Sequence, residues 1–311
     1  MPDNRERVIV SELAPLPSGR PERLVYFGTP DVAVAPLEAL VANGFDIALV
    51  VTRSDKRRGR GSDLAPTPVK DAARRLLIPV SHSVSDALDV GSDLGVVVAF
   101  GQLIREPVLT RLPMVNLHFS LLPRWRGAAP VERAILAGDA VTGVCLMQLE
   151  LGLDTGPILD RVEVPIGDRQ TAEELRSQLV EAGTEQLVRN LAPGLGPATP
   201  QVGEPTYAAK LEPAESAIDW SRTAVEADRL IRIGLAWTIF RGKRLKILAA
   251  EPFDAADTAD AGCFLGPVSV GCGSGSMRLR IVQPEGRPAM DAMAWSNGAR
   301  PVVGERVGAA R

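Results

Sequence analysis

The chain has 311 residues, 45% of them hydrophobic and 23% charged, with a formal net charge of −3. This length and composition match a globular protein of about two domains, and no apolar run is long enough for a membrane-spanning helix. Three cysteines without a C-x-x-C pair indicate neither disulfides nor a zinc site, so we expect a reducing cytoplasm and no metal.

The amino-terminal two thirds of the chain alternates apolar runs with helical patterns. Residues 1–22 mix acids and bases and lack the apolar core of a secretory signal, so we expect a disordered extension. Beyond them come four continuous apolar runs, typical of strands buried on both faces, at 23–28, 45–52, 93–100 and 114–118. Helices are predicted over 30–44 and 67–77. This alternation predicts a doubly wound, Rossmann-like α/β fold with a mostly parallel sheet.

A basic loop, RSDKRRGRG at 53–61, follows the second predicted strand. Its candidate phosphate-binding residues are Lys56, Arg57, Arg58 and Arg60. Such a run is often just a solvated surface. At the carboxyl end of a strand, however, guanidinium groups are well placed to bind phosphates, and the chain around them is net negative.

Asn116 and His118 end the fourth predicted strand. Positions two apart point to the same face of a strand, so both side chains can converge on one pocket. An amide N–H and an imidazole N–H together can stabilise an oxyanion. The alternative is structural hydrogen bonding. The other histidine, His82, lies in a polar stretch typical of a solvated loop.

Asp154 is a lone carboxylate between Gly152 and Gly156. It is either a turn residue or a group that orients an imidazole or accepts a proton. Nucleotide-binding glycine motifs are missing: FGTPDVA after the first strand is not G-x-G-x-x-G, and no P-loop pattern occurs. Because G-x-S-x-G is also absent, direct transfer is favoured over a covalent acyl-enzyme.

The carboxyl-terminal third changes in character. A stretch dense in Pro and Gly at 191–210 predicts a linker after a first domain at 23–190. Short strand patterns with Gly-rich turns follow one predicted helix. They predict a smaller β-rich domain at 211–311, resembling an OB-like barrel.

Long, ordered motifs resemble the folate-dependent formyltransferases. The segment NLHFSLLPRWRGAAP at 116–130 and the later GLDTG at 152–156 carry the resemblance. The remaining matches are FGTPD, DKRRGRG with PTPVK, VVVAFGQLI, LAGDAVTGVCLMQLELGLDTGPIL, TYAAKLEPAESAIDW and QPEGRPAM. Together they look like the methionyl-tRNA formyltransferase branch of that family, over nearly the whole chain from residue 23.

The resemblance implies an enzyme that transfers a formyl group from 10-formyltetrahydrofolate to the amino group of methionyl-initiator tRNA. Asn116 and His118 would stabilise the oxyanion. Asp154 would position His118 and help to remove the proton of the attacking amine. The folate would lie beside 96–101 and the segment after Met147. The residues that would line its site are Ser120, Leu121, Leu122 and Pro123. The basic loop and the carboxyl-terminal domain would bind the tRNA, and we expect a monomer.

Two features depart from the family pattern. Phe119 stands where many members have glycine, and we expect its ring to pack aside. The stretch at 233–236 is shorter than usual and falls in the second domain.

Two other functions remain open from the residues alone. One is a formyltransferase for a small acceptor, an amino-sugar nucleotide or glycinamide ribonucleotide, which would not require the basic loop. The other is an RNA-binding module without chemistry, in which Asn116, His118 and Asp154 are structural. An assay with formyl donor and charged initiator tRNA distinguishes all three.

Overall fold

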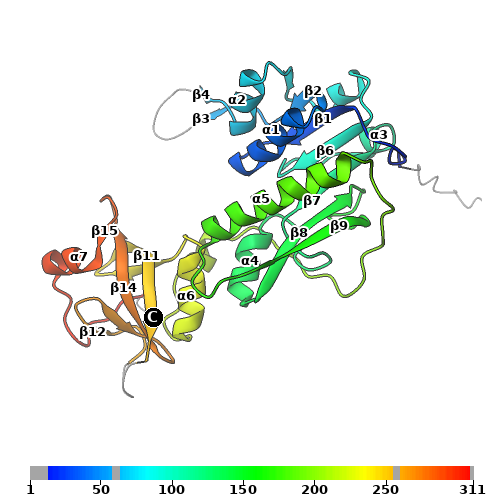
Figure 1. Ribbon diagram of the computed structural model, residues 1–311. Helices are drawn as coiled ribbons and strands as arrows, with labels where there is room; N and C mark the ends of the chain where they lie inside the picture. Colours follow the sequence, from blue (N-terminus) through cyan, green and yellow to red (C-terminus); the bar gives the residue numbers. More distant parts are fainter. Residues whose placement is uncertain (1–12, 58–63, 255–259, 309–311) are drawn as a thin grey trace, which may run out of the picture. The chain divides into compact units, whose positions relative to one another are not determined.

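The computed structural model describes residues 13–57, 64–254 and 260–308 and divides into two compact units (Figure 1). The first unit extends to Ala128 and also includes Thr142–Val164 and Arg176–Ala208. The second unit includes everything from Ala209 onward. Two short stretches, Ala129–Val141 and Pro165–Leu175, also belong to the second unit, which the sequence pattern did not indicate.

The first unit contains a seven-stranded sheet in the order β5-β2-β1-β6-β7-β8-β9. Its strands are β1 Arg23–Gly28, β2 Asp46–Val51, β5 Val80–Ser81, β6 Leu94–Val98, β7 Met114–His118, β8 Val141–Gln148 and β9 Ile158–Pro165. The pairs from β5 to β7 are parallel, and β8 pairs antiparallel with β7. The predicted doubly wound sheet is therefore confirmed, and β8 and β9 extend it beyond the predicted strands.

Helices connect and cover these strands. They are η1 Asp31–Ala33, α1 Val34–Ala42, α2 Pro68–Arg75, η2 Val84–Leu88, α3 Glu106–Leu109 and α5 Ala172–Leu191. Helix α2 begins as the sequence predicts, with Pro68 in its first turn and the Thr67 hydroxyl accepting from the Lys70 N–H. Figure 1 shows α5 as a long helix lying along the sheet of this unit. In α5, Gly183 leaves room for the Val144 side chain of β8.

Part of the basic loop forms a short strand, β3 Lys56–Arg57, which pairs with β4 Leu64–Ala65. Asp55, just before β3, accepts two hydrogen bonds from the Lys70 ammonium at 2.7 and 2.8 Å. These bonds lower the pKa of the Asp55 carboxyl. The single acid in the loop is thus paired with a base of α2. Arg58 and Arg60 lie outside the described residues.

The amino-terminal segment differs from its prediction where it is described. Disorder was expected as far as residue 22, but residues 13–22 contact the first unit. Ala14 is buried and its N–H donates to the Leu109 carbonyl. The Arg20 guanidinium stacks 4.6 Å above the Phe45 ring centre. These backbone and stacking contacts hold a segment that has no helical or strand periodicity. Residues 1–12 lie outside the described residues.

The second unit contains a six-stranded antiparallel sheet, with path β10-β11-β14-β13-β12 and β15 paired to β14. Its strands are β10 Trp237–Phe240, β11 Lys243–Phe253, β12 Phe264–Gly266, β13 Ser269–Gly271, β14 Ser276–Pro284 and β15 Met290–Asp291. Its helices are α4 Pro130–Ala137, η3 Pro213–Ser216, α6 Ala224–Arg232 and α7 Ala292–Ala299. The predicted β-rich carboxyl-terminal domain is confirmed.

Three aromatic rings pack together within the largely aliphatic core of this second sheet. The rings of Phe240, Phe264 and Trp295 lie 5.3 to 6.2 Å apart between centres, mostly edge to face. The short stretch at 233–236 forms a tight turn from α6 to β10, in which Gly234 has φ +77° and donates to the Ile231 carbonyl. Glycine suits this left-handed position, so four residues suffice for the connection. Among the described residues, no helix is long and apolar enough to cross a membrane.

Candidate active site

Asn116 and His118 point to one face of β7, as their spacing predicts. Their side chains are nearly enclosed, with 8% and 6% of the two residues exposed. Across the strand pair they face Met147 and Cys145 of β8. These two residues form a fully apolar cluster with Leu122 and Ile158. The two polar side chains therefore have apolar neighbours, and in such surroundings a hydrogen bond to a ligand is stronger than in water.

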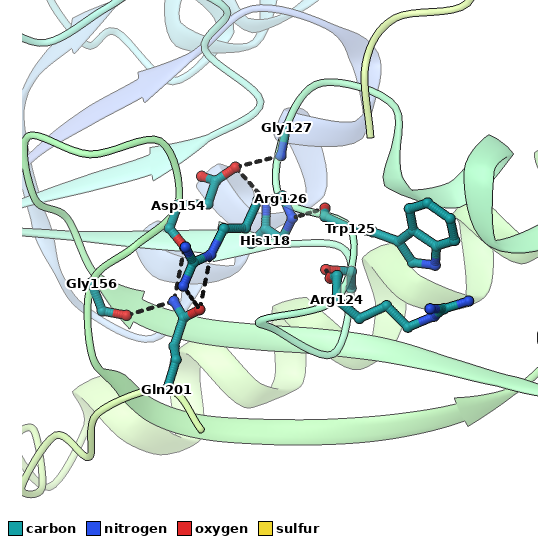
Figure 2. A network of polar contacts seen from close by, with 9 residues as sticks. His118, Arg124, Trp125, Arg126, Gly127, Asp154, Gly156 and Gln201 are labelled. Atoms are coloured by element: carbon teal, nitrogen blue, oxygen red, sulfur yellow. Dashed lines mark hydrogen bonds and ion pairs between the residues drawn. The ribbon is translucent and has the colours of Figure 1, made fainter. Parts of the chain in front are cut away.

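His118 is held by the backbone of the loop that follows β7. Its Nε2 donates to the Trp125 carbonyl at 2.9 Å, and its Nδ1 lies 3.6 Å from Asp154 Oδ2 (Figure 2). Because a carbonyl only accepts, Nε2 carries the proton in the neutral ring. Nδ1 is then a lone pair in neutral imidazole and an N–H only in the imidazolium. Asp154 is the acceptor that faces it.

The Asp154 carboxylate is positioned from the same loop. Its Oδ2 accepts the Gly127 N–H at 2.8 Å, and only 12% of its side chain is exposed. Asp154 itself has φ +50°, in the left-handed region that non-glycine residues rarely adopt. Trp125, with φ +63°, lies in the same region. Backbone strain of this kind gathers at functional sites.

Loop 123–127 and a distant segment hold each other in place. The Thr206 hydroxyl accepts the Trp125 N–H at 2.9 Å, and the Thr206 carbonyl accepts the Arg126 N–H at 2.9 Å. The Ala208 N–H donates back to the Arg126 carbonyl at 2.7 Å. Residues 199–208 fall within the predicted linker, and these bonds join them to the first unit.

Gln201 and Arg126 complete the network (Figure 2). Gln201 donates from Nε2 to the carbonyls of Asp154 and Gly156, each at 2.8 Å. Its Oε1 accepts from Arg126 at 2.6 and 3.1 Å. No pattern in the sequence indicates a role for these two residues. Arg126 belongs to the quoted motif, but Gln201 lies in a segment without periodicity, 47 residues beyond Asp154.

The four predicted folate residues are unequally available to a ligand. Ser120 is fully buried and its hydroxyl donates to the Arg124 carbonyl at 2.6 Å, while Leu122 is 1% exposed. Their side chains therefore shape the loop from within. Leu121 and Pro123 are half-buried and retain some accessible surface. The Phe119 ring lies beside Gly183 of α5, as expected for a ring that packs aside.

Cys145 offers no alternative nucleophile at this site. It lies opposite His118 on β8 and is fully buried. Burial raises the pKa of its thiol to about 11. The reactive thiolate is therefore scarce at neutral pH. In the described ranges, no cluster of three His, Cys, Asp or Glu side chains could hold a metal ion.

Gly156 is expected to be essential to the turn that presents Asp154. An added Cβ would lie 1.9 Å from the Gln148 carbonyl oxygen. We expect Gly156→Ala to lower the free energy of unfolding by about 1–3 kcal/mol, as overpacking usually does. Urea unfolding measures this. The matched control is Gly196→Ala, whose Cβ would have no heavy atom within 4 Å. Equal stability of the two variants would contradict the tight fit at Gly156.

Known proteins match both units. Residues 22–191 match the family described as formyl transferase, and residues 210–300 match the formyl transferase C-terminal domain. A methionyl-tRNA formyltransferase of Roseobacter denitrificans is 42% identical over 89% of this chain and 96% of that protein. One from Dinoroseobacter shibae is 44% identical over 87% and 95%.

A solved structure has the same fold. It is an N-formyltransferase from Helicobacter canadensis in complex with folinic acid and dTDP-3-aminofucose. It aligns with a TM-score of 0.66 over 85% of this chain and 99% of that one. At 18% identity, this likeness concerns the fold.

Proposed function

The chain belongs to the formyl transferase family, in which its curated relatives are methionyl-tRNA formyltransferases, and from this membership we propose a role for each residue of the site. The reaction transfers a formyl group from 10-formyltetrahydrofolate to the amino group of methionyl-initiator tRNA. The product, N-formylmethionyl-tRNA, serves translation initiation. Asn116, His118 and Asp154 are the groups that we propose to act on the reacting atoms.

The residues around Asn116 fit a formyl donor. Among the described residues, the enclosed Asn116 carboxamide has no hydrogen-bond partner, so its N–H groups remain available to a carbonyl oxygen. Beyond β6, Ala99 and Gly101 have φ +46° and +72°, in a turn that leads to an exposed Leu103. Backbone groups and an apolar side chain in such a turn suit a flat heterocycle. The bound donor supplies an electrophilic formyl carbon.

In this proposal Asn116 donates to the formyl oxygen as negative charge develops on it. His118 offers Nδ1, because Nε2 is already engaged by the Trp125 carbonyl. Nδ1, or the Asp154 carboxylate that faces it, can accept the proton that the attacking amine loses, and an Nδ1–H formed in this way donates to the same oxygen. Only a neutral amine is nucleophilic, so turnover should rise toward mildly basic pH. The folate contacts are proposed to come from residues 96–101, Leu121 and Pro123.

The basic loop is proposed to hold the tRNA. Lys56 and Arg57 pair with β4 at the carboxyl end of β2, the edge where α/β sheets bind ligands. Asp55 is engaged by Lys70, so it is not available to offset the bases of the loop. The expected location is the cytoplasm, where translation occurs, and the expected state is a monomer. The carboxyl-terminal residues 211–311 would add to the tRNA surface.

A formylation assay tests this function directly. Purified protein, 10-formyltetrahydrofolate and charged initiator tRNA should yield formylmethionyl-tRNA. Formylation of an amino-sugar nucleotide or of glycinamide ribonucleotide in place of the tRNA would favour the small-acceptor enzyme. Binding of tRNA without turnover would favour the RNA-binding module.

Neutralising Arg58 and Arg60 together should weaken tRNA binding and flatten its salt dependence. Each lost phosphate contact lowers the slope of log affinity against log salt by about 0.7–0.9. A salt series of tRNA affinity measures this effect, and a folate titration should be unchanged. The control neutralises Arg75 and Arg111, exposed residues that precede β5 and β7 at the opposite edge of the sheet. Equal salt slopes for the Arg58/Arg60 variant and the parent would contradict the loop's role.

A further inference from the structure

Gln201 uses every polar atom of its side chain at the turn that carries Asp154. Its amide nitrogen donates to two carbonyls, those of Asp154 and Gly156, and its oxygen accepts two bonds from the Arg126 guanidinium (Figure 2). A guanidinium only donates and carbonyls only accept, so the orientation of the carboxamide is determined. No other residue type of this length both donates to two carbonyls and accepts from an arginine.

Arg126 connects Gln201 to the backbone groups that hold His118 and the Asp154 carboxylate. It lies between Trp125, whose carbonyl accepts from His118, and Gly127, whose N–H donates to Asp154 Oδ2. Three consecutive residues, 125–127, therefore hold the whole arrangement. Trp125 binds the imidazole, Gly127 binds the Asp154 carboxylate, and Arg126 binds the Asp154 backbone through Gln201. Any shift of the Asp154 turn would change the approach of Oδ2 to His118 Nδ1.

The segment that carries Gln201 is itself fixed on both sides. Thr199 exchanges two backbone hydrogen bonds with Ile158 at the start of β9, at 2.7 and 2.8 Å. Thr206 binds Trp125 and Arg126 at the other side. Gln201 therefore lies in a segment, residues 199–206, that is hydrogen-bonded to the start of β9 at one end and to loop 123–127 at the other.

We propose that Gln201, oriented by Arg126, is a positioning residue that sets the Asp154 carboxylate against His118. Asp154 occupies the left-handed region at φ +50°, which costs free energy for a residue with a Cβ. Two hydrogen bonds to the carbonyls of Asp154 and Gly156 stabilise that conformation. This inference rests on the proposed role of Asp154 and adds a residue that acts only through it.

The test is a double-mutant cycle between Gln201 and Asp154 in the full-length protein. Gln201→Met keeps the length of the side chain and removes all four hydrogen bonds. It should lower kcat about 10- to 100-fold, the scale for misplacing a reacting group by about 1 Å. KM for tRNA and for the formyl donor should change little. In an Asp154→Asn background the same substitution should lower kcat less than about threefold, because coupled residues are not additive.

A second variant separates hydrogen bonding from packing. Gln201→Glu keeps the contact with Arg126 but turns a carboxylate oxygen toward two carbonyls, so it should lose as much kcat as Gln201→Met. Each variant should also change the shape of the pH profile of kcat, which a purely structural role would not alter. Val202→Ala is the matched control, since Val202 is the next residue and is 85% exposed. If Gln201→Met does not fold, Arg126→Lys replaces it in the cycle.

Each outcome is decisive. Parent-like kcat for Gln201→Met, equal losses in the parent and Asp154→Asn backgrounds, or a loss confined to KM would overturn the positioning role while leaving the proposed function of Asp154 intact. Parent-like turnover of Asp154→Asn alone would instead remove the proposed role of Asp154, and the positioning role with it, while the proposed formyl transfer would stand. A large loss in the parent background that disappears in the Asp154→Asn background supports the inference.

Discussion

Replacing His118 or Asn116 with alanine should lower turnover by about 100-fold or more, the scale for losing one oxyanion donor. Both side chains are nearly enclosed and lie opposite Cys145 and Met147 of β8. Because these surroundings are buried and apolar, water cannot easily replace a missing donor. Each variant removes a polar group from the face of β7 that we propose to meet the formyl oxygen. Single-turnover formylation of methionyl-tRNA measures the chemical step directly.

The fold should survive both substitutions, since neither residue closes a turn or fills the centre of a cluster. Thermal unfolding of each variant checks this. His82→Ala is the matched control for His118→Ala: the second histidine is exposed, and its ring binds only the Thr52 carbonyl among the described residues. Its turnover should stay within about twofold of the parent. Near-parent turnover of His118→Ala or Asn116→Ala would remove that residue from the chemistry.

Asp154→Asn should lower turnover by about 100- to 10,000-fold, the range for loss of a general acid or base, with little change in donor affinity. The carboxamide can still accept the Gly127 N–H, so the turn keeps its shape. The oxygen that accepts from Gly127 is also the one that faces His118 Nδ1, so the amide presents a neutral oxygen there in place of a carboxylate. It can no longer accept the proton that the attacking amine loses.

The pH dependence of kcat should change with this substitution. In the parent, Asp154 Oδ2 lies 3.6 Å from His118 Nδ1. Asparagine does not titrate, so the limb of the profile that reports the carboxylate should disappear. A pH series of kcat for parent and variant, with a folate titration beside it, makes the measurement. Identical profiles and rates would reduce Asp154 to a turn residue.

Local patterns in the sequence determined much of this protein. The apolar runs located β1, β2, β6 and β7 to within a few residues, because a strand buried on both faces must be apolar throughout. Thr67 and Pro68 marked the start of α2. A period of two placed Asn116 and His118 on one face without any knowledge of the rest of the chain. The long motifs indicated the family, and with it Asp154.

Tertiary structure alone decided how these groups are held. The Trp125 carbonyl and the Gly127 N–H orient His118 and Asp154. Because backbone groups are the same at every residue, no pattern of side chains in the sequence predicts these contacts. Residues 13–22 and 199–208 lack periodicity, and their places depend on hydrogen bonds to distant partners. Gln201 reaches Asp154 across 47 residues of chain. Periodicity describes one element at a time, whereas the meeting of loops depends on how whole elements pack.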